Sequence, residues 1–251
     1  MRIEVCLDDV EGVATARSHG ASSVELLSAF SQGGLTPSLG AVRRSLALAG
    51  GDLVVNVMVR PRPGDFVYDD TELGIMVEDI HALRELSGEG RGPLGVVFGA
   101  LLPSGRVDAR AVTLLREAAG EMPVTFHKAV DQTPDVIVAT QTLVDAGVRR
   151  VLTSGGRTRL VDGAPLLARM VEVAGPTGTV VAAGLFDVDD DVTTLLSDAG
   201  IFDIHITAHA PVASRSVFTP HEMTFDVGSR LATSPSRLAA IGRLLSAPSR
   251  A

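Results

Sequence analysis

The sequence has one cysteine, one tyrosine and no tryptophan in 251 residues, and each scarcity excludes a class of protein. The single cysteine, Cys6, cannot form an internal disulfide or a multi-cysteine zinc site, and it suits a reducing compartment. Aromatic residues are only 4% of the chain and Lys and Arg form no cluster, so we expect no nucleic-acid partner. No apolar run approaches the roughly 18 residues that span a membrane, so we expect no membrane partner either.

What remains is the composition of a globular protein. Hydrophobic residues are 45% and charged residues 21%, and the net charge of -8 is spread along the chain. Met1 and Arg2 lead directly into a strand-like run at 3–7, which leaves no room for a secretory signal. We therefore expect a cytoplasmic protein.

Short apolar runs alternate with longer runs of helical period along the whole chain. This alternation predicts parallel strands joined by crossover helices. One predicted helix carries Leu39, Val42 and Leu46 on a single face, and later segments repeat the pattern. The expected strands begin near eight positions, which are Arg2, Ser23, Leu53, Gly95, Pro123, Arg150, Thr179 and Asp203.

Eight regular units predict the α/β class and a single-domain (β/α)8 TIM barrel over residues 1–251, a fold that typically takes about 250 residues. A doubly wound open sheet is the alternative, but the GxGxxG motif that normally follows its first strand is absent. A stretch rich in Ser, Thr and Pro predicts a long loop at about 211–234, before the C-terminal helix.

Polar residues recur at every second position of the apolar strands. Because alternate residues of a barrel strand point inward, this parity predicts a polar interior. Glu4 and Cys6 share one face of the first strand, and Glu25 stands among apolar neighbours in the second. The same parity holds in later strands for Asn56, Met58 and Arg60, for Thr125 and His127, and for Asp203, His205 and Thr207.

Active sites of such barrels lie where the strands end. We predict catalytic roles for Glu4, Glu25, Arg60, His127 and His205, in which Arg60 binds an anion and His127 or a Glu moves a proton. Two structural alternatives stay open, a buried Glu4–Arg60 ion pair and a His127 that is hydrogen-bonded in the core. Predicted substrate-binding residues are Asn56, Arg62, Lys128, Asp131, Thr153, Ser154, Gly155, Gly184 and Thr207.

Three further segments have two interpretations each. The turn at 153–156, completed by Gly184, can present backbone N–H groups to a phosphate or can be a tight turn only. The acidic run of Asp187, Asp189, Asp190 and Asp191 can bind a metal ion, but we favour capping of the following helix. His209 and His221, at the start of the predicted loop and within it, can reach the mouth of the barrel, but surface placement is the simpler interpretation.

Over nearly its whole length the chain resembles the CutC proteins, which are described as copper homeostasis factors. The likeness rests on ordered blocks, which are Glu4-Val5-Cys6, Val24-Glu25-Leu26, GGLTPS at 33–38, RPRPGDF at 60–66, VTFH at 124–127 and VLTSG at 151–155. The resemblance implies a (β/α)8 barrel, a homo-oligomer (dimer or tetramer) and a link to copper. The chain departs from the family where Asn56 replaces a histidine and Leu27 replaces a frequent cysteine, which leaves Cys6 as the one thiol for copper, with Met58 nearby.

These observations leave three functions open. The first is a lyase, isomerase or aldolase-like enzyme that moves a proton on a small polar or anionic substrate, such as a sugar, a sugar phosphate or a carboxylate, with no certain cofactor. Lys128 as a Schiff-base nucleophile is its weaker form, because strand parity points that side chain away from His127. The second is a protein that binds or transports Cu(I), with Cys6 as a metal ligand, or that binds a divalent metal ion instead. The third is a barrel without catalysis that acts through a surface partner.

Overall fold

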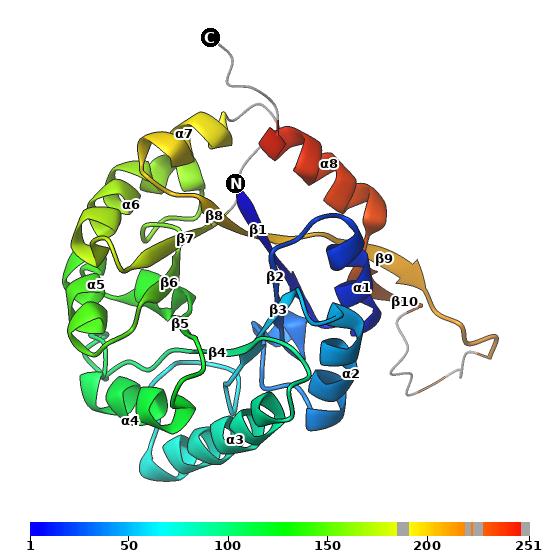
Figure 1. Ribbon diagram of the computed structural model, residues 1–251, viewed down its shortest axis with the longest axis horizontal. Helices are drawn as coiled ribbons and strands as arrows, with labels where there is room; N and C mark the ends of the chain where they lie inside the picture. The colour runs from blue at the N-terminus through cyan, green and yellow to red at the C-terminus, as the bar shows by residue number, and fades with distance from the viewer. Residues whose placement is uncertain (185–190, 219–221, 223–227, 247–251) are drawn as a thin grey trace.

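A computed structural model of the chain describes residues 1–184, 191–218, 222 and 228–246. Eight parallel strands follow one another around a closed barrel, and β8 returns to pair with β1 (Figure 1). The barrel strands are β1 (Arg2–Leu7), β2 (Ser23–Leu26), β3 (Val54–Met58), β4 (Leu94–Phe98), β5 (Val124–Phe126), β6 (Arg150–Thr153), β7 (Thr179–Ala183) and β8 (Asp203–Thr207). The predicted (β/α)8 barrel is confirmed, and each strand begins within one residue of its expected position.

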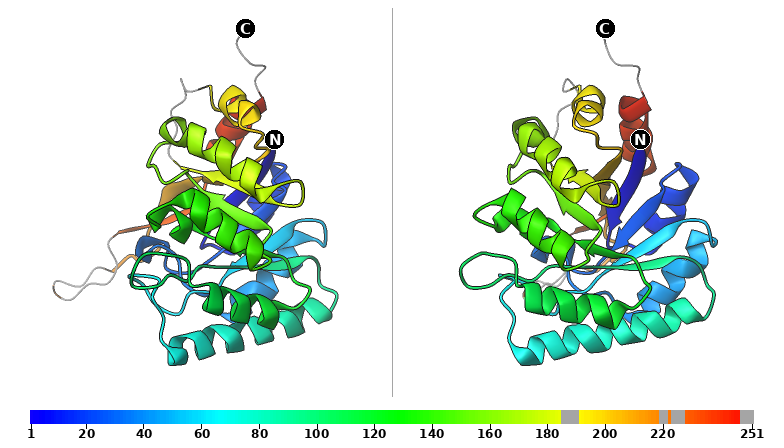
Figure 2. Two further views of the ribbon diagram at one scale, coloured as in Figure 1. Left: turned by 90° about the vertical axis from the view of Figure 1, so that its left-hand side faces the viewer. Right: turned by 60° about the vertical axis from the view of Figure 1, so that its left-hand side comes forward.

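Helices surround the strands on the outside of the barrel (Figure 2). They are α1 (Glu11–Ser18), α2 (Leu39–Ala49), α3 (Asp70–Gly88), α4 (Ala109–Ala119), α5 (Val136–Asp145), α6 (Leu160–Ala174), α7 (Val192–Asp198) and α8 (Pro235–Ser246), with short 3-10 turns η1 (Phe30–Gln32) and η2 (Lys128–Gln132). In the described part of the chain, none of them combines the length and apolarity needed to cross a membrane.

Side-chain caps fix several helix starts. Asp69 and Glu72 form a reciprocal capping box at the start of α3, which satisfies backbone N–H groups that lack partners within the helix. Asp191 caps α7 by accepting from Thr194 N at 3.1 Å, so for this residue the capping interpretation is confirmed. Asp187, Asp189, Asp190 and His221 lie outside the described residues.

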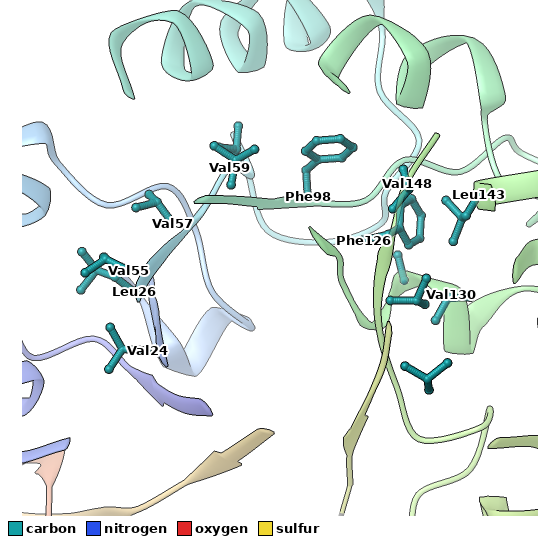
Figure 3. Packing of buried hydrophobic residues seen from close by; sticks show 14 of the residues in the cluster. Val24, Leu26, Val55, Val57, Val59, Phe98, Phe126, Val130, Leu143 and Val148 are labelled. Atoms are coloured by element: carbon teal, nitrogen blue, oxygen red, sulfur yellow. The ribbon is translucent and has the colours of Figure 1, made fainter. Parts of the chain in front are cut away.

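The apolar core lies between the barrel strands and the helices. Val24 and Leu26 of β2, and Val55 of β3, are at most 1% exposed and point outward from the strands (Figure 3). Glu25 stands between Val24 and Leu26, and Asn56 directly follows Val55, so both face the barrel interior. The core thus fixes the orientation of every polar side chain that the strands carry inward.

The stretch expected to be an irregular loop at about 211–234 contains regular structure at both of its ends. β9 (His209–Ala213) and β10 (Ser229–Thr233) pair antiparallel as a two-stranded ribbon beside α1 (Figure 1). The sequence did not predict it because both strands are short and mostly exposed, so no alternation of apolar and polar residues marks them. His209 is also corrected, because it is buried rather than at the surface.

Candidate functional site

Glu4 of β1 is the centre of a buried polar network inside the barrel. Its Oε2 accepts hydrogen bonds from Asn56 Nδ2 at 2.6 Å, Ser23 Oγ at 3.0 Å and Arg150 Nη2 at 3.0 Å. Its Oε1 lies 3.0 Å from His205 Nδ1. Burial alone raises the pKa of Glu4, but the hydrogen bond with His205 and the charge of Arg150 reverse this and lower it to about 2. Glu4 is therefore a fixed, ionised carboxylate.

Strand register explains why these side chains meet. Glu4 is level with His205 across β1 and β8, and Cys6 is level with Glu25 across β1 and β2. Residues that are level in neighbouring parallel strands point to the same face of the sheet. The register therefore brings Glu4 to His205, and Cys6 to Glu25, inside the barrel.

His205 connects these two pairs. Its Nδ1 contacts Glu4, and its Nε2 lies 3.7 Å from Glu25 Oε2. Because Glu4 is ionised, Nδ1 carries the proton that is shared with it, and Nε2 is left to face Glu25. Burial lowers the pKa of His205, but the charge of Glu25 and the hydrogen bond with Glu4 outweigh burial and raise it. His205 is thus an oriented imidazole with increased proton affinity.

Glu25 and Cys6 complete this group. Cys6 Sγ donates to Glu25 Oε2 at 3.4 Å, while Glu25 Oε1 is buried without a hydrogen-bond partner among the described residues. Burial raises the pKa of Glu25, and burial together with the charge of Glu25 raises the pKa of Cys6. Ligand atoms of Cys6, Glu25 and His205 lie within 4.8 Å of one another. The same atoms can exchange protons or bind a metal ion.

A cavity of about 950 Å³, hereafter the mouth cavity, opens at the carboxyl ends of the strands. It brings together Cys6 and three of the predicted catalytic residues, Glu25, His127 and His205. Its lining also includes the predicted substrate-binding residues Lys128, Asp131, Ser154, Gly184 and Thr207. Glu4 and Asn56 do not line the cavity; Asn56 contacts Glu4, and Glu4 contacts the cavity-lining His205.

The turn after β6, predicted to present backbone N–H groups to a phosphate, already binds an anion that belongs to the protein. The Asp131 carboxylate accepts from Ser154 N at 3.0 Å, from Gly156 N at 2.8 Å and from Thr153 Oγ1 at 2.6 Å. These donors are therefore occupied by a side chain of the protein itself, which argues against the phosphate-binding interpretation of this turn. The sequence predicted the donors correctly but not the acceptor that reaches them.

Lys128 also differs from its expected orientation. It lies in η2, just after β5 ends, so the parity of the strand no longer sets its direction. Its Nζ donates to Asp131 Oδ2 at 2.7 Å, Ser154 Oγ at 2.8 Å and Ala183 O at 3.1 Å. The side chain is 46% exposed and places a positive charge at the rim of the mouth cavity.

His127 is held as a neutral hydrogen-bond donor. Its Nδ1 accepts from Ala129 N at 3.1 Å, so the proton of the neutral ring is on Nε2. Nε2 is buried without a hydrogen-bond partner among the described residues. Burial and the nearby charge of Arg60 lower the pKa of His127 to about 3. His127 is therefore suited to donate to a substrate oxygen, and the expected role as a base is corrected.

Arg60, the predicted anion clamp, holds loops instead. Its Nη1 donates to Gln32 O at 3.2 Å and Gly34 O at 3.0 Å, and its Nη2 donates to Gly64 O at 2.7 Å. The guanidinium group lies over the Phe66 ring at 4.8 Å from the centroid and does not line the mouth cavity. Both terminal nitrogens are occupied by backbone carbonyls, so the clamp role is corrected to a loop-positioning role.

Arg62 and Gly155 likewise have structural roles. Arg62 forms ion pairs with Glu72 and with Asp65, away from the mouth cavity. At Gly155 the backbone has φ +68°, and an added Cβ would lie 2.6 Å from Gly163 O, so this glycine permits close packing of the turn on α6. Neither residue contacts the space in which a substrate would bind.

Arg150 is a member of the buried network around Glu4 that sequence reasoning missed. It begins β6, pairs with Glu4 at 3.0 Å and donates to Thr125 Oγ1 at 2.9 Å. The proposed Glu4–Arg60 ion pair is thus corrected to Glu4–Arg150. Its parity was visible, because Arg150 and the cavity-lining Leu152 occupy the same face of an apolar strand.

Comparison with known proteins places this chain in a family. Residues 1–210 match the model of the CutC family. The family protein CutC of Mesorhizobium japonicum is 40% identical over 212 residues, which cover 84% of this chain and 79% of that protein. The copper homeostasis protein cutC homolog of Homo sapiens is 37% identical over 208 residues, which cover 83% of this chain and 73% of that protein.

Solved structures share the fold. A CutC crystal structure from Streptococcus agalactiae has a TM-score of 0.72 and 28% identity, and the match covers 82% of this chain and 97% of that one. An N-acetylneuraminate lyase from Proteus mirabilis, at a TM-score of 0.57 and 8% identity over 81% of this chain and 69% of that one, shares the barrel fold alone. The family match and the identities to curated relatives together show that this chain belongs to the CutC family.

Proposed function

We propose that this protein is an enzyme that transfers a proton on a small polar or anionic substrate, in a reaction of the lyase or isomerase type. The observation that carries the proposal is the arrangement of His205, which is fixed at Nδ1 by the buried carboxylate of Glu4 and faces the carboxyl group of Glu25 with Nε2. General acid–base catalysis needs such positioned groups with shifted pKa values. His205 and Glu25 both line the mouth cavity.

Each residue then has a definite role. Glu4 keeps Nδ1 of His205 protonated and stabilises the imidazolium that forms when Nε2 takes a proton from the substrate. Glu25, whose pKa is raised by burial, is the acid that returns a proton to the substrate. His127 offers its Nε2–H to a substrate oxygen on which negative charge develops.

The lining of the mouth cavity supports the class of substrate. Lys128 and the exposed Arg157 place two positive charges at the cavity, while Leu27, Phe30 and Met58 supply apolar walls. A small carbon skeleton with a carboxylate or phosphate group matches this combination. Because Asp131 occupies the turn donors and also pairs with Lys128, we assign recognition of the anionic group to Arg157.

Exchange of substrate hydrogens with deuterated water tests the proposal without knowledge of the product. Panels of sugars, sugar phosphates and 2-oxo acids are incubated with the protein, and deuterium incorporation is followed by NMR. We expect exchange at one carbon of at least one compound. His205→Gln should slow this exchange by at least about 100-fold, the usual contribution of a general base.

His19→Gln is the matched control, because His19 is an exposed histidine on the outside of the barrel. This variant should exchange deuterium at the wild-type rate. Equal exchange rates for wild type and His205→Gln would refute the role of His205. Exchange that disappears in Lys128→Met but persists in His205→Gln would favour Schiff-base chemistry instead.

A Cu(I)-binding function is the second candidate, and one specific observation favours it. Cys6 and Met58 lie in one small buried cluster with Leu27, and Cys6 also contacts Glu25 in the group with His205. Thiolate and thioether sulfur are the ligands that Cu(I) prefers, so the donor set fits with copper as cargo. The raised pKa of Cys6 means that copper must displace a tightly held proton, so affinity should rise with pH.

Titration of the reduced protein with Cu(I) against a competing chelator separates the two candidates. Cys6→Ser should abolish Cu(I) binding if copper is the cargo, yet it should leave deuterium exchange measurable. Unchanged Cu(I) affinity in Cys6→Ser would refute the thiol-based function. We further propose a cytoplasmic homo-oligomer, dimer or tetramer, whose mass light scattering would measure.

A further inference from the structure

A second group of potential ligands lies outside the site described above. Asp8 and Asp9 follow directly after β1, and His209 is the first residue of β9. One ligand atom from each of the three lies within 4.8 Å of the others. The proposed proton transfer uses none of them. We propose that Asp8, Asp9 and His209 bind a divalent first-row metal ion of the Zn²⁺ type.

His209 distinguishes this group from an ordinary acidic cluster. It is only 7% exposed, and neither ring nitrogen has a hydrogen-bond partner among the described residues. Buried polar side chains are nearly always hydrogen-bonded, so an orphaned imidazole points to a partner outside the chain. The imidazole is aimed at the carboxylates, because Nε2 lies 3.9 Å from Asp8 Oδ1.

That separation is too long for a hydrogen bond but suits two ligands of one ion. Zinc binds nitrogen and carboxylate oxygen at about 2.0–2.2 Å, which at the tetrahedral angle puts the two ligand atoms about 3.3–3.6 Å apart. An ion between His209 and Asp8 therefore needs little movement of either side chain. Asp9, within the same 4.8 Å, supplies a third ligand.

Contacts around the group already orient the ligands. Asp8 Oδ2 accepts from Phe30 N at 3.3 Å, and Asp9 Oδ1 accepts from Thr233 N at 3.0 Å and from Thr233 Oγ1 at 2.6 Å. The Phe30 ring packs edge-on against His209, with 4.5 Å between centroids. Such outer contacts hold ligand side chains in place at metal sites.

Charge and access agree with this assignment. Two carboxylates balance a divalent charge, and one imidazole with carboxylate oxygens is typical of Zn²⁺ or Mn²⁺ rather than of Cu(I). Asp8 and Asp9 line a separate cavity of about 560 Å³, which gives an ion a path to the group. Because Thr233 ends β10 and His209 begins β9, the ion would join the end of β1 to the ribbon.

Calorimetric titration of chelator-stripped, full-length protein with ZnCl₂ tests the proposal. We expect one ion per chain. Asp8→Asn and His209→Gln should each weaken binding more than about 100-fold, because loss of an outer contact alone costs about 10–100-fold. Thr233→Val, which removes an outer contact and no ligand, should weaken binding within that 10–100-fold range and guards against a ligand variant that fails to fold.

Two control variants locate the ion. Cys6→Ser changes the group formed by Cys6, Glu25 and His205, and His19→Gln removes an exposed histidine; both variants should bind Zn²⁺ as wild type does. Substitution by Co²⁺ should give a spectrum of nitrogen and oxygen ligands without a thiolate charge-transfer band. The proposal would be overturned if His209→Gln and Thr233→Val bound Zn²⁺ with wild-type affinity, or if Cys6→Ser lost binding. A thiolate band, or a wild type that does not bind Zn²⁺, would overturn it as well.

Discussion

Replacement of Glu4 by Gln should destabilise the barrel, and the loss should depend on pH. Glu4 is 2% exposed and its pKa falls from a usual 4.5 to about 2 in the folded protein. One pKa unit corresponds to about 1.36 kcal/mol, so ionised Glu4 stabilises the fold by about 3 kcal/mol at neutral pH. Removal of one partner from a buried ion pair typically costs about 3–5 kcal/mol, and Arg150 loses its partner here.

The sign of the pH dependence follows from the lowered pKa. A carboxyl group whose folded-state pKa is depressed contributes stability above its unfolded pKa, and this contribution is lost as pH falls toward the folded pKa. The stability contributed by Glu4 should therefore be complete above about pH 5 and should disappear between about pH 4.5 and pH 2. Acid unfolding of the wild type should include this loss, and Glu4→Gln should lack it.

Urea unfolding of wild type and Glu4→Gln at a series of pH values measures the effect. The difference in unfolding free energy cancels the titration of groups whose pKa does not depend on Glu4. It should be about 3 kcal/mol at neutral pH and should shrink steadily below about pH 4.5. Glu85→Gln, at an exposed position of α3, should differ from wild type by less than about 0.5 kcal/mol. A Glu4→Gln difference that stays constant down to about pH 3 would refute an ionised, pKa-depressed Glu4.

Three other predictions concern Gly155, Cys6 and His127. Gly155→Ala should destabilise the fold by at least about 2 kcal/mol in urea unfolding, because its Cβ meets Gly163 O, whereas Gly20→Ala, with a similar φ in open space, should cost about 1 kcal/mol. Cys6 should react with iodoacetamide far more slowly in the folded protein than in the unfolded chain, and its reaction should become faster as pH rises. Mass spectrometry measures the extent of this reaction. NMR titration should show His127 neutral down to about pH 4, since its pKa is about 3.

The barrel could be predicted because its strands and its helices each impose a regular spacing of apolar residues on the sequence. Apolar residues such as Val24 and Leu26 must face the helices, so the residue between them, Glu25, faces inward. The same parity correctly placed His205 and Thr125 inside the barrel. These assignments depend only on strand geometry, which is why they needed no knowledge of the loops.

The roles of loop residues could not be predicted in this way. Arg60 donates to carbonyl groups of two loops, and Asp131 reaches the turn after β6. Both contacts depend on the course of the loop backbone, which leaves no regular spacing of residues in the sequence. Sequence spacing indicated an anion site at that turn but could not show that a carboxylate of the same chain fills it. The ribbon that contains His209 was missed for the same reason, because exposed strands carry little pattern.

The carboxylate of Asp131 accepts hydrogen bonds from the turn after β6, so a side chain of the protein itself is the ligand of this turn. A homologue that lost this side chain would expose the amides of Ser154 and Gly156 beside the ammonium group of Lys128, with every strand unchanged. A new oxyanion pocket would then need one substitution and no insertion. Barrels of this kind can therefore come to bind different ligands by losing a side chain that fills a site, without gaining a new loop.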